Sequence, residues 1–242
     1  MLLQCEIQDA DATGGAAAAL RTNTIDSLVE LNESCLSLFA EQARVGTGEG
    51  LLGQFGEQWR QLDAAGRRRA AACHYLIFDT GFADARRWQR PAGEQGPATG
   101  AAFFTVAGTA ALVHTVFVFG WHLARCDGSA AQLLLGMPAP CVNLIAQRTL
   151  GQVRSLAAAH PEWLRPRWLR HPRMWRELLA AARTDDPPAL WRAQLRGQTL
   201  LAAETRAYCE PLRLAPAFAR RRGPVVAREP PQRVAARRQA ER

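Results

Sequence analysis

The chain has 242 residues, is 48% hydrophobic and carries a formal net charge of +8 at pH 7. Its apolar content excludes a protein that is disordered throughout, and its length suffices for one large domain or two small ones. All 30 basic residues are arginine, a side chain whose planar guanidinium favours bidentate pairing with carboxylates and phosphates.

The first part of the chain predicts a small helical domain at 21–90, preceded by a flexible N-terminus at 1–20. In TIDSLVELNESCLSLFAEQA, which begins at Thr24, apolar residues recur at helical spacing. Beyond GTGEG, apolar clusters alternate with charge, and this pattern predicts two short helices that are separated near Asp63 to Gly66.

A shift in composition then marks a boundary. Glycine, proline and polar residues dominate 86–100, so we place a linker at 91–102 and a second helical domain at 103–210.

The positive charge is concentrated at the C-terminal end. Residues 211–242 contain nine arginines and two glutamates, whereas 1–210 are nearly neutral, with 21 arginines and 20 acidic residues. The last segment lacks the apolar periodicity that packing requires, which predicts a disordered basic tail. Two interpretations of the tail are a solvated extension and a segment that binds nucleic acid or acidic partners through Arg220, Arg221 and Arg222.

The six cysteines form no CxxC pair, so neither a zinc ribbon nor a dense disulfide framework is indicated. Thiols in this pattern suit a reducing compartment, and the first residues lack the basic region of a secretory signal. We therefore expect a cytoplasmic protein.

Residues 101–121 carry no formal charge, and their number fits a membrane span. The run is rich in alanine, glycine and threonine, has His114 near its middle and is not accompanied by a second span. These features favour the alternative, which is a helix buried in the protein or in a dimer interface.

Several short helices are predicted from Ser129 onward, separated by glycine and proline. Thr149 and Gln152 have the spacing of a capping box, so one helix should begin at Leu150. Prolines bound the stretch 161–171, which should therefore run extended.

Pro172 is well placed as the first residue of the following helix. That helix has an apolar stripe that should face the core, namely Trp175, Leu178, Leu179 and Ala182. A last helix should begin at TDDPP with a second stripe, namely Leu190, Trp191, Gln194, Leu195, Thr199, Leu200 and Leu201.

Five arginines in this region are candidates for contact with DNA or a protein partner: Arg165, Arg167, Arg170, Arg173 and Arg176. Contact with phosphates is one interpretation of them, and a solvated face paired with carboxylates is the other.

No P-loop, GxGxxG, HExxH, GxSxG or EF-hand motif occurs. Cys73 and His74 are adjacent, but neighbouring residues of a helix point in different directions. His114 and His122 share a helical face and fit polar groups within a bundle better than a pair of metal ligands. We therefore expect no catalytic residue, metal, cofactor or small-molecule substrate, and we do not expect an enzyme.

Residues 104–205 resemble FlhD, the all-helical subunit of the bacterial flagellar transcriptional activator. The first shared pattern is an apolar helix that leads into an aspartate, a stretch of small residues and a leucine-glycine pair. Here these positions are Asp127, Leu135 and Gly136.

A second pattern follows at the family's spacing, with Thr149, Gln152 and Leu156 in RTLGQVRSLA. The family's aromatic-arginine-aromatic turn is retained here as Arg167 and Trp168, with proline in place of the first aromatic residue.

Three positions depart from the family pattern: Arg148 replaces a leucine, Leu134 replaces an arginine, and Leu164 replaces a cysteine that bridges subunits in many members. We therefore expect no such bridge. ELNESCLSLFA at 30–40 is similar to the family's own first helix, which indicates either a duplicated dimerisation module or a chance likeness between amphipathic helices.

The resemblance implies an all-α multi-helix bundle in which an FlhD-like domain follows a small N-terminal helical domain. It implies a homodimer with a helix at 104–125 in the interface, and a transcriptional regulator that works with an FlhC-like partner and DNA. A membrane location is not expected, because the interface accounts for the charge-free run. The alternative is a helical adaptor that keeps the fold without binding DNA specifically.

Overall fold

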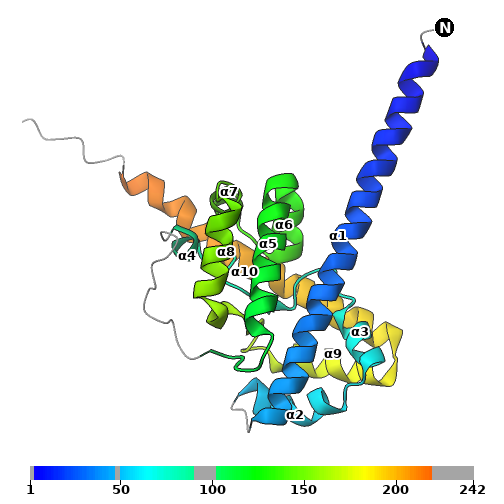
Figure 1. The fold of residues 1–242 in the computed structure, drawn as a ribbon, viewed down its shortest axis with the longest axis vertical. Coiled ribbons are helices and arrows are strands. Elements are labelled where there is room, and N and C mark those ends of the chain that lie inside the picture. The colour runs from blue at the N-terminus through cyan, green and yellow to red at the C-terminus, as the bar shows by residue number, and fades with distance from the viewer. Residues whose placement is uncertain (1–2, 47–49, 90–101, 220–242) are drawn as a thin grey trace, which may run out of the picture.

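The computed structural model describes residues 3–46, 50–89 and 102–219 (Figure 1). Their almost entirely helical structure confirms the predicted all-α multi-helix fold. The elements are α1 (Leu3–Val45), α2 (Leu51–Gln61), α3 (Ala64–Ala71), β1 (Phe78–Asp79), α4 (Ala85–Gln89), α5 (Thr109–Cys126), α6 (Gly128–Leu135), α7 (Ala139–Ala146), α8 (Leu150–Ala159), a 3-10 turn (Pro161–Trp163), β2 (Arg165–Pro166), α9 (Pro172–Thr184) and α10 (Pro187–Ala219).

Helix α1 is longer than the helix predicted from Thr24. It begins inside 1–20, the segment expected to be flexible, and Figure 1 shows its first part projecting beyond the other helices. The four alanines at 16–19 account for the difference, because alanine is the strongest helix former. Farther along, the predicted apolar face is confirmed by the burial of Leu28, Leu31, Cys35, Leu36 and Phe39.

The predicted break between α2 and α3 is confirmed. Asp63 caps α3, and its carboxylate accepts a hydrogen bond from the backbone N of Gly66 at 2.6 Å. After α3 the chain is held by Asn32, a buried side chain of α1. Its Nδ2 donates to the carbonyl of Tyr75 at 2.9 Å, and its Oδ1 accepts from the backbone N of Ile77 at 3.1 Å. Helix α1 thereby fixes the segment that leads into β1.

Helix α5 contains the charge-free run. It begins at Thr109, later than the expected residue 104, because Gly108 takes a left-handed backbone conformation with φ 92°. One face of α5 is buried within the chain itself, against α1, α6, α7 and α8. Among the described residues no single helix is long and apolar enough to cross a membrane, and α6 and α7 reach that length only as a pair bent by 120°.

The three short helices α6 to α8 follow the predicted punctuation. Asp127 caps the start of α6, and Gly136 ends it in the left-handed region with φ 68°. Helix α8 begins at Leu150, and both hydrogen bonds of the predicted capping box between Thr149 and Gln152 are present.

The stretch 161–171 differs from the extended segment that was predicted. Its first residues form the 3-10 turn, and only β2 is extended, because it pairs antiparallel with β1. A turn follows in which Trp168 has a positive φ of 55°. The prolines therefore end the helices as expected, while pairing with a distant strand decides the shape of the connection.

Helix α9 begins at Pro172 as predicted, and its expected stripe is buried. The stripe predicted on α10 is wrong in part, since Trp191 is 62% exposed and Leu195 is 47% exposed. Small residues of α10 pack inward instead. A Cβ at Gly197 would collide with the hydroxyl of Tyr75, so bulky residues cannot occupy this contact.

Helix α10 extends to Ala219 and so enters 211–242, the segment predicted to be a disordered tail. Arg220, Arg221 and Arg222 lie outside the described residues, as does the predicted linker apart from residue 102.

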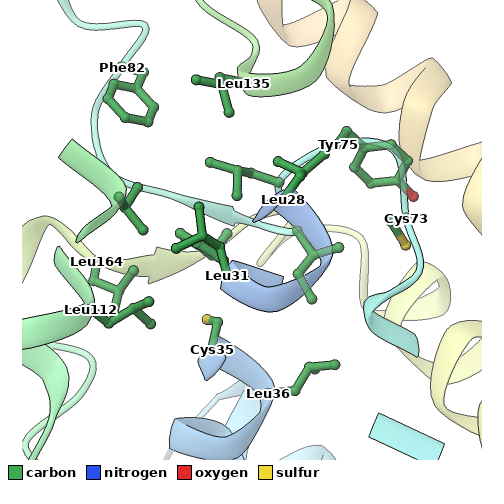
Figure 2. Close-up of a cluster of buried hydrophobic side chains, with 14 of the residues drawn as sticks. Leu28, Leu31, Cys35, Leu36, Cys73, Tyr75, Phe82, Leu112, Leu135 and Leu164 are labelled. Carbon is green, nitrogen blue, oxygen red and sulfur yellow. The ribbon is translucent and has the colours of Figure 1, made fainter. Parts of the chain in front are cut away.

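Residues from 21–90 and from 103–210 contribute to the same hydrophobic cluster. Figure 2 shows Leu31 of α1, Leu112 of α5 and Leu164 close together in it. Helices also pack across the predicted boundary, because α9 lies against α2 and α3 while α4 lies against α7. The two parts of the chain thus share one core.

Candidate functional site

A cleft of about 280 Å³ lies where the turn after β2 meets α10. Strand β2 and the turn after it contribute residues 165–171, β1 contributes Asp79, and α10 contributes Glu204, Thr205 and Tyr208. We call this the corner cleft. It brings five of the predicted positions, Gly136, Arg165, Arg167, Trp168 and Arg170, to one place.

Arg167 forms the floor of the corner cleft. It is 6% exposed, and its guanidinium donates to the carbonyls of Phe78 at 2.9 Å and Leu135 at 2.7 Å. It also pairs with Glu204 at 3.3 Å. The prediction that Arg167 contacts DNA or a partner from the surface is therefore wrong. Its cation lies instead at the C-terminal end of α6, where helix carbonyls lack intrahelical partners.

Glu204 carries the acidic charge next to Arg167. Burial raises the pKa of this carboxyl, Arg167 opposes the rise, and Asp79 adds to it. Glu204 therefore pairs with the buried cation of Arg167, and Asp79 adds a second carboxylate to the lining of the cleft.

Trp168 supports the cleft from behind. It is 4% exposed and packs against Tyr75 and Trp175, with ring centroids 5.7 and 6.4 Å apart. A positive φ is rare for a bulky residue, so this packing stabilises a strained turn. This turn directs Leu169 and Arg170 outward, where both are exposed.

A second groove of about 370 Å³ adjoins the corner cleft across Arg170 and His171, which line both. Arg173, Arg196, Met174 and Leu200 also line this groove. Its walls are therefore cationic and its base is apolar.

We call the arginines around both openings the arginine surface: Arg165, Arg170, Arg173 and Arg196. Glu177 at its edge pairs with Arg173 at 2.7 Å and with Arg196 at 3.3 Å. Sequence reasoning missed Arg196, because no local pattern connects α10 with the turn after β2.

Arg176 lies apart from the arginine surface. It is exposed, and its Cζ is 6.0 Å from the ring centroid of Phe55 on α2. Of the five predicted arginines in this region, the structure brings Arg165, Arg170 and Arg173 together at the surface.

The positions that resemble FlhD have structural roles. Asp127 and Thr149 are helix N-caps, and Gly136 is a left-handed C-cap. Leu135 and Leu156 are buried in the core.

Burial separates the adjacent Cys73 and His74. Cys73 is buried, and burial raises the pKa of its thiol to about 12, which disfavours a nucleophilic thiolate. His74 next to it is exposed. In the part of the chain that the structure describes, no group of three or more His, Cys, Asp or Glu residues could hold a metal ion.

Comparison of the chain with protein-family models, with curated proteins and with solved structures gave no match.

Proposed function

We propose that this chain is a subunit of an FlhD-like transcriptional regulator, which acts in the cytoplasm with an FlhC-like protein partner. It would control flagellar or related genes. The observation that carries the proposal is the arginine surface around two adjoining grooves. Guanidinium groups bind phosphate and carboxylate oxygens in bidentate geometry. A DNA backbone or the acidic face of a partner would supply such oxygens.

The FlhD-like positions support the choice of family. Asp127, Gly136 and Thr149 set helix ends, and Leu156 contributes to the core. Residues of this kind determine where helices begin, end and pack, so their shared spacing supports a shared fold. DNA or partner contact is then a property of the arginine surface.

Salt dependence separates binding by the folded part from binding by the C-terminal segment. Each phosphate that a cation neutralises changes the slope of log K against log salt by about −0.9 on duplex DNA. The four arginines of the arginine surface can account for a slope of about −3 to −4. The nine arginines of 211–242 can contribute up to about −8.

The test is fluorescence anisotropy with a labelled promoter duplex at several salt concentrations, with and without an FlhC-type subunit. The full chain is compared with an Arg170→Gln/Arg173→Gln double variant and with Arg154→Gln, which changes an exposed arginine on α8. We expect the double variant alone to bind more weakly, with a slope reduced by about two. Equal affinity and slope in all three proteins would contradict DNA contact by the arginine surface.

A second candidate function is a helical adaptor that binds another protein without reading DNA. The exposure of Trp191 and Leu195 on α10 favours it, because exposed aromatic and aliphatic side chains commonly anchor protein interfaces. Truncation after Ala219 separates the two candidates. If all DNA binding and its salt slope disappear with 220–242, the adaptor is the better account.

A further inference from the structure

The two short strands β1 and β2 form an antiparallel pair. Phe78 faces Pro166 and Asp79 faces Arg165. Arg165 lies 87 positions after Phe78, and Pro166 lies 87 positions after Asp79. If residues 87 positions apart are taken as equivalent, the two facing pairs are equivalent to each other. Any antiparallel pair has such local two-fold symmetry. In this chain equivalent positions also occur outside the strands.

The segments after the strands obey the same shift. Gly81 and Trp168 lie 87 positions apart, and both have a positive φ, 77° and 55°. The next helices begin at Ala85 and Pro172, which are also 87 positions apart. Two turns of unusual backbone conformation at equal distances from two helix starts indicate a repeated unit.

A tryptophan occupies the same place in each of these helices. Trp88 and Trp175 are 87 positions apart, and both are fully buried. Each indole N–H donates to a carbonyl of the turn before its helix. Trp88 reaches Gly81 at 3.0 Å, and Trp175 reaches Arg167 at 2.8 Å.

The long helices α1 and α5 correspond to each other, with equivalent residues 81 positions apart. A groove between them is lined by five residues of α1, and by four residues of α5 together with Gly108 just before it, and every member of the second set lies 81 positions after a member of the first. Three of these pairs are Leu31 and Leu112, Ser34 and Thr115, and Leu38 and Phe119. A groove lined by equivalent residues from both helices is what a two-fold axis between them produces.

The helices that carry the tryptophans, α4 and α9, are exchanged between the two halves of the chain. Trp175 lies 5.6 Å from Phe39 of α1, and Trp88 lies 5.1 Å from Phe117 of α5, measured between ring centroids. Likewise α9 packs against α2, and α4 packs against α7. Each tryptophan helix therefore packs on the helices of the other half of the chain.

We infer that residues 24–89 and 105–184 are two copies of one unit, packed about an approximate two-fold axis with α4 and α9 exchanged. The binding partner of each repeat is the other repeat of the same chain. Between the long helix and the N-cap of α3 or α8 the second repeat has five more residues than the first, which changes the shift from 81 to 86, and one further position before the strands gives 87. One chain thus forms within itself the two-fold assembly that a single unit would need a second chain to form.

The test uses the full chain, in a tagged and an untagged form that are unfolded, mixed and refolded together. We expect a native mass of 26.6 kDa by light scattering, a thermal midpoint independent of protein concentration, and no untagged chain retained with the tag. Twice that mass, with tagged and untagged chains purified together, would overturn the inference, because the exchange would then join different chains.

A protease site inserted between Ala92 and Gly93 gives a second, independent measurement. After cleavage the two pieces should stay together as one particle of unchanged mass and separate only in denaturant. Pieces that separate in native buffer would show that the repeats are not each other's partner.

Discussion

The two repeats have a similar frame but different surfaces. Their strands pair with one another, and each has a buried tryptophan, Trp88 or Trp175, that packs on a phenylalanine of the other repeat. In the strands, Arg165 of the second repeat corresponds to Phe78 of the first. Phe78 is fully buried.

The turn differs in the same way. Arg170 and His171 of the second repeat correspond to Ala83 and Asp84 of the first. The arginine surface is therefore formed by the second repeat together with Arg196 of α10, which lies outside both repeats, and a single partner site per chain follows if the proposed function holds. The comparison teaches that the strand pairing, the positive-φ turns and the buried tryptophans are kept in both repeats, while other positions diverge, including the buried pair Thr80 and Arg167.

The largest effect is expected from the equivalent tryptophans. Trp88→Ala and Trp175→Ala should each lower the free energy of unfolding by about 3 to 5 kcal/mol, because each removes a fully buried indole. Urea denaturation measures this loss, with Trp191→Ala as the control. Trp191 is 62% exposed, so its loss should cost less than about 0.5 kcal/mol. Similar costs for all three would contradict the equivalence.

A smaller effect is expected from Arg167, which has no counterpart in the first repeat, where Thr80 stands in its place. Arg167→Ala should destabilise by about 3 kcal/mol, because it leaves the carbonyls of Phe78 and Leu135 without their donor. Arg170→Ala, an exposed neighbour, should change stability by less than about 0.5 kcal/mol. A stable Arg167→Ala protein with improved or unchanged DNA binding would mean that this residue is not the support of the cleft.

Gly81 in the turn of the first repeat can be compared with a glycine inside a helix, Gly151 of α8. Gly81→Ala should destabilise by about 1 kcal/mol, because an L residue is strained at φ 77°. Gly151→Ala in α8 should instead stabilise by up to about 1 kcal/mol, since a Cβ there meets only Thr149 Oγ1 at 3.9 Å. Thermal unfolding of both variants checks the opposite signs, and a gain of stability at Gly81 would contradict the strained turn.

The smallest effect concerns pH. Burial raises the pKa of Glu204 in the folded chain above its ordinary value of 4.5. The folded chain therefore holds this proton more tightly than the unfolded chain does. The resulting stability is fully present below pH 4.5 and is lost as pH rises through the raised pKa. Glu204→Gln should flatten this part of the curve of unfolding free energy against pH, whereas Glu30→Gln on α1 should leave it unchanged. A curve unaltered by Glu204→Gln would refute the assignment.

Local signals made much of the fold predictable. The capping box at Thr149, the helix start at Pro172 and the stripe around Trp175 depend on residues within a few positions of one another, and all three are confirmed. The segment 1–20 was predicted to be flexible, whereas α1 begins at Leu3, because the alanines at 16–19 favour a helix there.

The candidate site was less predictable, because distant contacts determine it. Arg167 is buried by carbonyls from β1 and α6, and Arg196 joins the arginine surface from α10. Trp191 faces outward because Gly197 brings α10 close to Tyr75. Spacing within one helix carries no information on any of these contacts.

Matched substitutions at Arg173 and at Arg86, its counterpart in the first repeat, test most directly whether only one repeat carries the contact surface. The measurement is the affinity of the full-length Arg173→Gln and Arg86→Gln proteins for a labelled promoter duplex across a salt series. The account predicts weaker binding and a slope reduced by about one for Arg173→Gln, and wild-type behaviour for Arg86→Gln. Equal losses in the two variants, or no loss in either, would contradict it.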